Sequence, residues 1–291
     1  MSPRLPPELE REIFEIAALA HSRTAPPLLR VARRVFLWIE PLLYQSLMTV
    51  RKADVDGVRH ALQHKPGHLE HVRHLFLYIG REAFEDGLSI DEGHVLLARC
   101  PNLESLYIGG FAPAAEAARY IALVKNLGKI RKWCSSSFID MFHILHHGQP
   151  HQPFFQSLSH LILLEEVLPP ETLEGLPMLP ALTHMCLRNP RHYFYFRDLL
   201  QHCRHLQVLV GIYHQFRTEF RSNPPCSDDR FVIYLDLSWH FWADWETGLR
   251  GETDIWAAAE RFIARKKRRE VAGFILEDPL PYTYANAVNL I

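Results

Sequence analysis

A short apolar motif recurs along most of this 291-residue chain, and it constrains the fold more than any other feature of the sequence. The motif places apolar residues at relative positions −6, −3, 0 and +2, as in Leu69, Val72, Leu75 and Leu77. Its six zero positions are Leu75, Leu106, Trp133, Leu161, Met185 and Leu209. A degenerate seventh copy consists of Val232, Leu235 and Leu237.

The spacing of these copies, about 24 to 31 residues, is typical of a repeat that contributes one short strand and one helix. Helical spacing (i, i+3, i+4, i+7) lies between the predicted strands at Phe196, Leu199, Leu200 and Cys203, and again within 138–145. Strands and helices that alternate at this period resemble a leucine-rich repeat. We therefore expect an α/β fold in which residues 49–230 form an irregular leucine-rich-repeat solenoid with a parallel sheet.

The concave face of such a solenoid is the usual binding surface. Strand side chains would lie on that face or at its edges, for example those of Phe76, Tyr107, Lys132, Ile162, Cys186 and Val210. The sequence does not rank these side chains, so the target-binding residues are left unassigned.

Residues 231–291 differ in pattern from the repeats and predict the end of the solenoid. A strand near Val232 is followed by a tryptophan-rich segment, a strong helix that begins after Asp254, and a final strand over 271–276. We expect this region to cap the open core of the last repeat. Trp239, Trp242 and Trp245 then pack at that end, the alternative being an aromatic binding surface.

Residues 1–48 predict a separate module of two or three short helices. Leu9, Ile13 and Ile16 recur at helical spacing, and two prolines within 21–27 end that first helix. A module of this size cannot bury its own apolar residues, so it needs a partner or the rest of the chain.

The segment LPPELEREIFEIAALA…PPLLRVARRVFLWIEPLLYQSL resembles an F-box. The family pattern is carried by Leu5, Pro6, Glu8, Leu9, Ile13, Phe14, Leu28, Leu29, Val31, Arg33, Arg34 and Trp38. The chain departs from it at Ala32, where the family often has Cys, and at Val35, where it often has an aromatic residue. This resemblance covers about 44 of the 291 residues, and the later residues also resemble the F-box proteins with irregular leucine-rich repeats that abound in mushroom-forming fungi.

The resemblance implies a non-catalytic substrate-recognition subunit of an SCF-type cullin–RING ubiquitin ligase. A Skp-type adaptor protein would bind the F-box, and an unknown target protein would bind the repeats. The implied adaptor-binding residues are Leu5, Pro6, Leu9, Ile13, Phe14, Leu28, Leu29, Val31, Val35 and Trp38.

Two alternatives stay open. The chain is an interaction scaffold without a ligase role if its N-terminal helices pack on the first repeat, near 69–77, whereas an exposed apolar face favours the ligase subunit. A metal-dependent enzyme would use His143 and His147, which lie four residues apart on a predicted helix with His146 and His151 nearby.

Charge and motifs exclude several other classes. A formal net charge of −1 argues against a generally basic nucleic-acid binder and against attachment to anionic membranes. Because no hydrolase elbow, phosphate loop, dinucleotide fingerprint or His-Glu-x-x-His is present, we expect no enzyme, cofactor or metal. Five widely spaced cysteines indicate a reducing compartment, the cytoplasm or nucleus. The basic run at 265–269 is a nuclear-import candidate or simply the last turn of a helix.

Overall fold

The structure is a computed structural model. It describes residues 5–20, 25–79, 87–109, 120, 122–125, 127–135, 153–164, 168–188, 194–213, 224–235 and 241–276.

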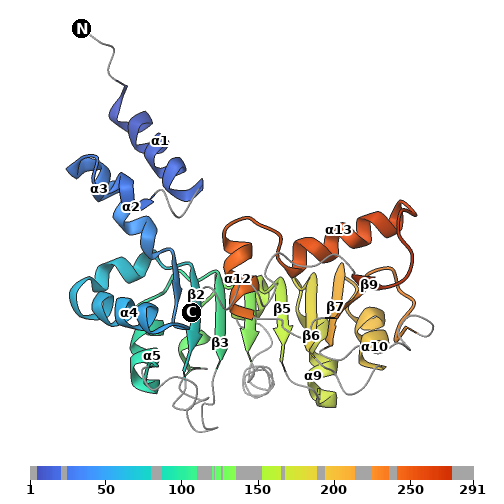
Figure 1. The fold of residues 1–291 in the computed structure, drawn as a ribbon. Coiled ribbons are helices and arrows are strands. Elements are labelled where there is room, and N and C mark those ends of the chain that lie inside the picture. Colours follow the sequence, from blue (N-terminus) through green and yellow to red (C-terminus); the bar gives the residue numbers. More distant parts are fainter. Residues whose placement is uncertain are drawn as a thin grey trace.

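A parallel sheet forms the centre of the protein. In the described part of the chain it contains nine strands whose spatial order is also their order in the sequence (Figure 1). The strands are β1 (Ser46–Met48), β2 (His74–Tyr78), β3 (Ser105–Gly109), β4 (Lys132–Ser135), β5 (His160–Leu163), β6 (His184–Arg188), β7 (Val208–Tyr213), β8 (Phe231–Leu235) and β9 (Ile275–Leu276). The predicted α/β fold with a parallel sheet is therefore confirmed.

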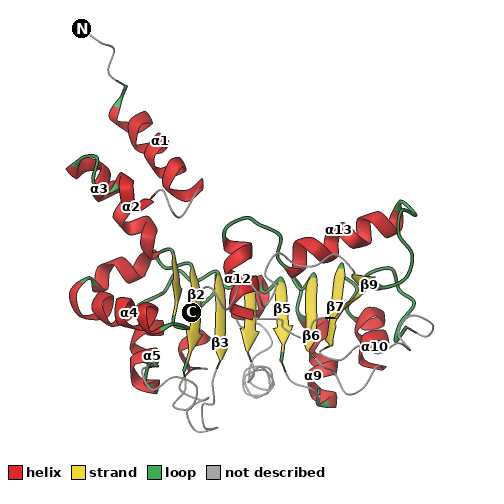
Figure 2. Ribbon diagram, in the orientation of Figure 1, coloured by secondary structure: helices red, strands yellow, loops and turns green. Residues whose placement is uncertain are grey.

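Helices connect the strands and lie outside the single row that the strands form (Figure 2). N-terminal to the sheet are α1 (Pro7–Ala20), α2 (Ala25–Leu28), α3 (Arg33–Ile39) and the 3₁₀ helix η1 (Glu40–Tyr44). The sheet is accompanied by α4 (Lys52–His64), η2 (Pro66–His71), α5 (Ile90–Ala98), α8 (Pro153–Ser157), α9 (Pro170–Gly175), η3 (Leu176–Met178), α10 (Phe194–His202), α12 (Phe241–Leu249) and α13 (Ile255–Lys267).

The strand register follows the apolar motif of the sequence. Leu75 pairs with Leu106, Leu106 with Trp133, and the pairing continues through the remaining zero positions as far as Leu209. These side chains are buried, at most 3% exposed. The seventh copy was placed wrongly, because Phe231 and not Leu235 pairs with Leu209. The strand Ser46–Met48 was also missed, having been included in the helical module.

The main core fills the space between one face of the sheet and the helices that follow its strands. Zero-position side chains meet buried residues of α4, α5, α8 and α10, among them Val58, Leu97, Phe155 and Phe196. Burying each large apolar side chain contributes about 1.5–3 kcal/mol, so this continuous cluster stabilises the whole row of strands.

The opposite face of the sheet is covered by α12 and α13. Trp242 and Trp245 of α12 pack against a cluster centred on Phe76, Tyr107 and Cys134, which lie on β2–β4. The apolar side of α13 packs against β6–β8. Residues 231–276 thus add β8 and β9 at one edge of the sheet, as a cap would, but they also return across its face (Figure 1).

Helix α5 is fixed at its N-terminus by a capping box and a salt bridge. Ser89 Oγ accepts the N–H of Glu92, and the Glu92 carboxylate accepts the N–H of Ser89. Arg59 on α4 donates to the same carboxylate at 2.8 Å. These interactions, chiefly the Arg59 hydrogen bond, lower the pKa of Glu92 from 4.5 to about 2.

A pH-dependent stability follows for Glu92. Because its pKa is lowered on folding, its ion pair stabilises the protein above about pH 4.5, and this contribution is lost as the pH falls toward 2. We expect the wild type to melt at a higher temperature than Glu92→Gln near neutral pH, and the two curves to converge toward pH 2. Thermal melts of both proteins across this pH range measure the difference in melting temperature. A difference that does not change with pH would contradict the stabilising role of the Glu92 ion pair.

Candidate functional site

Helix α1 has two apolar sides, and only one is packed. Phe14 and Ala18 face a small core that includes the buried Val35 and Ile39 of α3. An ion pair at 2.5 Å between Arg34 and Glu10 also links α3 to α1. Leu5 precedes the helix and, with the other apolar side, forms what we call the α1 stripe: Leu5, Leu9, Ile13, Ile16 and Leu19, each 47–59% exposed.

The ten predicted adaptor-binding residues divide into three groups in the structure. Exposed are Leu5, Pro6, Leu9, Ile13 and Val31. Half-buried and packed against the module's own core are Phe14, Leu28, Leu29 and Trp38. Val35 is 0% exposed and packs in the small core, where it holds α3, so its side chain offers no surface for direct contact with an adaptor in this structure.

The predicted adaptor-binding set omits four exposed apolar residues of the module. Ile16 and Leu19 continue the α1 stripe, Leu37 is 61% exposed on α3, and Leu43 is 41% exposed on η1. The spacing from Ile13 to Ile16 was the available signal, because residues three apart share a helix face.

The module joins the sheet through η1. Tyr44 packs against the main core and lies edge-on to His68, with ring centroids 4.9 Å apart. Lys65 donates to Glu40, and this hydrogen bond raises the pKa of Lys65. The helices α1–α3 project beyond this junction, at the end of the sheet that begins with β1 (Figure 1).

On the face covered by α12 and α13, the register aligns a second set of side chains. We call it the polar row: His74, Ser105, Lys132, His160 and His184, which are paired in succession across β2–β6. Ser105 accepts a hydrogen bond from Nε1 of Trp245 at 3.1 Å, which fixes α12 to β3. His184 Nε2 lies 3.0 Å from Glu260 and fixes α13 to β6.

The imidazoles of His160 and His184 stack with ring centroids 4.2 Å apart. Burial, reinforced by His184 and Lys132, lowers the pKa of His160 to about 3. Burial also lowers the pKa of His184, against the opposing effect of Glu260. His160 is therefore neutral near pH 7.

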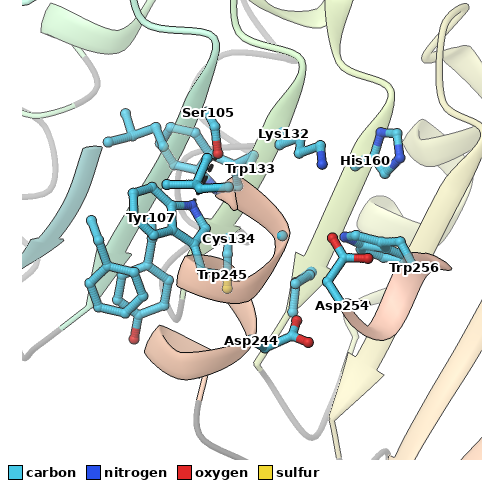
Figure 3. Close-up of a pocket in the computed structure, with 15 residues that line it drawn as sticks. Ser105, Tyr107, Lys132, Trp133, Cys134, His160, Asp244, Trp245, Asp254 and Trp256 are labelled. Carbon is cyan, nitrogen blue, oxygen red and sulfur yellow. Dashed lines mark hydrogen bonds between the residues drawn. The ribbon is translucent and has the colours of Figure 1, made fainter. Parts of the chain in front are cut away.

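A pocket with a cavity volume of about 50 Å³, open to solvent on one side, lies between the polar row and the helices α12 and α13. Figure 3 shows Tyr107, Trp245 and Cys134 on one side of it and Asp254 with Trp256 on the other. Its charged lining residues are Lys132, Asp244 and Asp254; its polar and aromatic walls come from β2–β5 and from both helices.

The two aspartates hold the start of α13. Asp244, 4% exposed, accepts the N–H of Ile255 at 2.8 Å. Asp254 is the N-cap residue and accepts the N–H of Ala257 at 2.9 Å. A side chain at Gly248 would place its Cβ 2.5 Å from Oδ2 of Asp254. Glycine at this position therefore avoids a steric clash with the carboxylate beside the pocket.

The strand side chains expected on an open binding face are largely covered. Phe76 and Tyr107 are buried beneath α12, while Cys186 and Val210 are buried in the cluster beneath α13. Lys132 is exposed and Ile162 is half-buried, and both line the pocket. Among the described residues, the part of this face beside α12 and α13 forms the pocket.

The cysteines are buried free thiols. Burial raises the pKa of Cys100 to about 12 and that of Cys203 to about 11, so neither is a thiolate at neutral pH. Two of the five, Cys134 and Cys186, occupy the same register position on β4 and β6.

The predicted histidine cluster of His143, His146, His147 and His151 lies outside the described residues, as does Trp239. Elsewhere in the described chain no group of three His, Cys, Asp or Glu residues is placed to hold a metal ion.

The basic run at 265–269 ends α13 and is partly engaged. Lys266 lies over the ring of Phe274 at 4.0 Å and pairs with Asp229, while Arg268 pairs with Glu270. These contacts fit the basic last turn of a helix better than an exposed nuclear-import signal.

No protein-family model matches the sequence, and a search of curated proteins finds no match. Among the described helices, none is long and apolar enough to cross a membrane.

Proposed function

We propose that this protein is a non-catalytic substrate-recognition subunit of an SCF-type cullin–RING ubiquitin ligase. In this proposal residues 1–48 are a divergent F-box that binds a Skp-type adaptor. Residues 49–230 are an irregular leucine-rich-repeat array, completed by residues 231–291, that holds a target protein. The protein acts in the cytoplasm or nucleus, and the chemistry takes place on other subunits.

The α1 stripe is the observation that carries this proposal. Among the described residues, most large apolar side chains that are exposed belong to the N-terminal module; Val95 and Met178 are the exceptions. A contiguous exposed apolar surface on a small module marks a contact with another protein. Glu8 and Glu12 lie along α1 beside the stripe, whereas Glu15 is paired with Arg11, so a complementary groove would have apolar walls and basic groups opposite Glu8 and Glu12.

The packing of α1 favours this proposal over a simple N-terminal cap. A cap would bury its apolar side on the first repeat, around Leu69–Leu77. Helix α1 packs instead on α2, α3 and η1, and its core is separate from the cluster that contains Leu75.

The mechanism is tethering. A subunit that holds adaptor and target together raises the effective concentration of the target at the ligase and fixes its orientation. No catalytic group is required of this chain for that role.

An interaction scaffold without a ligase role is the second candidate. The firm junction at η1, with the Lys65–Glu40 pair and the packing of Tyr44 on the main core, is the observation that favours it. In that case the N-terminal helices serve only to complete the fold.

Co-purification with a purified Skp-type adaptor tests the proposal. The full chain is compared with a chain that begins at Glu40, which retains Tyr44 and β1 and therefore the contacts of the sheet. We expect a stoichiometric complex with the full chain and none with the shortened chain. Failure of the folded full chain to bind the adaptor would exclude the ligase role and leave the scaffold.

A further inference from the structure

The pocket between the sheet and the helices α12 and α13 contains two opposite charges that are not used in ion pairs. Lys132 projects from β4 and Asp254 precedes α13, and both line the pocket. Within the described part of the chain, neither forms a salt bridge with the other or with a third residue. The third charged group, Asp244, is buried and bonded to the start of α13.

One oxygen of Asp254 is left for a ligand. Its Oδ1 caps α13 through the N–H of Ala257, whereas Oδ2 lies against Gly248 and accepts no hydrogen bond from the described residues. Any residue larger than glycine at position 248 would collide with this oxygen. The carboxylate is thus held in place by one oxygen while the other can accept an N–H donor.

The rest of the lining is mostly apolar and aromatic; its polar members are His160 and Ser105, which accepts a hydrogen bond from Trp245. Tyr107, Ile162 and Trp245 supply hydrocarbon and aromatic surface, and His160 is neutral near pH 7 because burial lowers its pKa. A ligand that satisfies this lining carries a cationic group for Asp254, an anionic group for Lys132, and a small apolar group between the walls.

From this lining we propose that the pocket binds a free α-amino acid with an apolar side chain. The α-ammonium group donates to Oδ2 of Asp254, the α-carboxylate pairs with Lys132, and the side chain packs against Trp245 and Ile162. An internal peptide segment has neither terminal charge. A phosphate ester would meet two carboxylates and a single lysine. This inference is independent of adaptor binding and goes beyond it.

Calorimetric titration of the full chain with free apolar amino acids tests the proposal, and thermal shifts provide a second readout. We expect at least one of them to bind. Its N-acetyl derivative lacks the ammonium and its amide lacks the carboxylate. Each should bind about ten- to a hundredfold more weakly, because one charged contact is lost.

Substitutions assign the two charges separately. Lys132→Gln should weaken binding of the free amino acid and remove the preference for the free amino acid over its amide. Asp254→Asn keeps an acceptor for the helix cap and should remove the preference for the free amine over the N-acetyl form. Lys129→Gln is the matched control: it makes the same change at an exposed lysine bonded to Asn102, outside the pocket lining, and should leave affinity unchanged.

Three results would overturn the proposal. The first is no binding of any free apolar amino acid at concentrations of about 10 mM, far above the range of a specific site. The second is equal affinity for the N-acetyl derivative, which would make the pocket a site for organic anions. The third is an equal effect of Lys129→Gln and Lys132→Gln. Each can occur whether or not the adaptor binds.

Discussion

The double variant Leu9→Asp/Ile13→Asp is expected to lose stoichiometric binding of a Skp-type adaptor while the protein stays folded. Both side chains are about half exposed, 47% and 54%, so the free protein loses little packing. In a complex each would bury its apolar surface, which contributes about 1.5–3 kcal/mol. The substitutions remove that gain and add the cost of desolvating two carboxylates, so we expect affinity to fall more than about a hundredfold.

A matched control separates the docking surface from a general effect of added charge. Val95→Asp/Met178→Asp introduces the same two charges at apolar residues that are 50% and 63% exposed, but on α5 and η3. The control should bind the adaptor like the wild type. Co-purification and calorimetry measure binding, and circular dichroism checks the fold. Retained binding by the Leu9/Ile13 variant would mean that the α1 stripe is not the docking surface.

Phe154→Ala should cause a large loss of stability. Phe154 is 0% exposed, meets Trp133 edge-on with ring centroids 5.1 Å apart, and packs beside Phe155. Removing a buried phenyl ring leaves a cavity that typically costs about 3–5 kcal/mol. Because folded proteins are stable by only about 5–15 kcal/mol, this is a large share of the total.

Chemical unfolding of the full chain measures this loss. Phe154→Leu retains most of the volume and should cost less than half as much, whereas Met178→Ala, at a residue 63% exposed, should change the free energy of unfolding by less than about 0.5 kcal/mol. A loss below about 1 kcal/mol for Phe154→Ala would show that α8 is not packed on β4 as described.

Local pattern was sufficient for several elements. The repeated apolar motif located β2 to β7 and their register, because a strand with one face in the main core must place its zero-position side chain there. Asp254 before an apolar helical stripe located the start of α13, since a side-chain acceptor satisfies the exposed N–H groups of the first turn.

The phase of β8 could not be found in the same way. Phe231 and Ile233 belong to the main core, while Val232 and Tyr234 belong to the cluster beneath α13. A strand buried on both faces has apolar residues at every position, and the alternation that fixes register disappears.

The two faces of α1 illustrate a related limit. Phe14 and Ile13 are neighbours in the sequence and both are apolar, yet Phe14 packs inside the module and Ile13 is 54% exposed. Helical spacing shows that two apolar sides exist. Only the position of α3 decides which one is covered.

The sequence alone determined strands β2 to β7, their order and the N-terminal helices, because these depend on contacts between residues close in the chain or one repeat apart. The tertiary structure alone decided the pocket and the location of α12 and α13. Trp245 and Ser105 form a hydrogen bond across 140 residues of sequence. An apolar helix face indicates that the helix is buried on that side, but it does not specify which surface covers it. The same face could pack at the end of a sheet or across it. The choice is made by the shape and chemistry of the surfaces that finally meet.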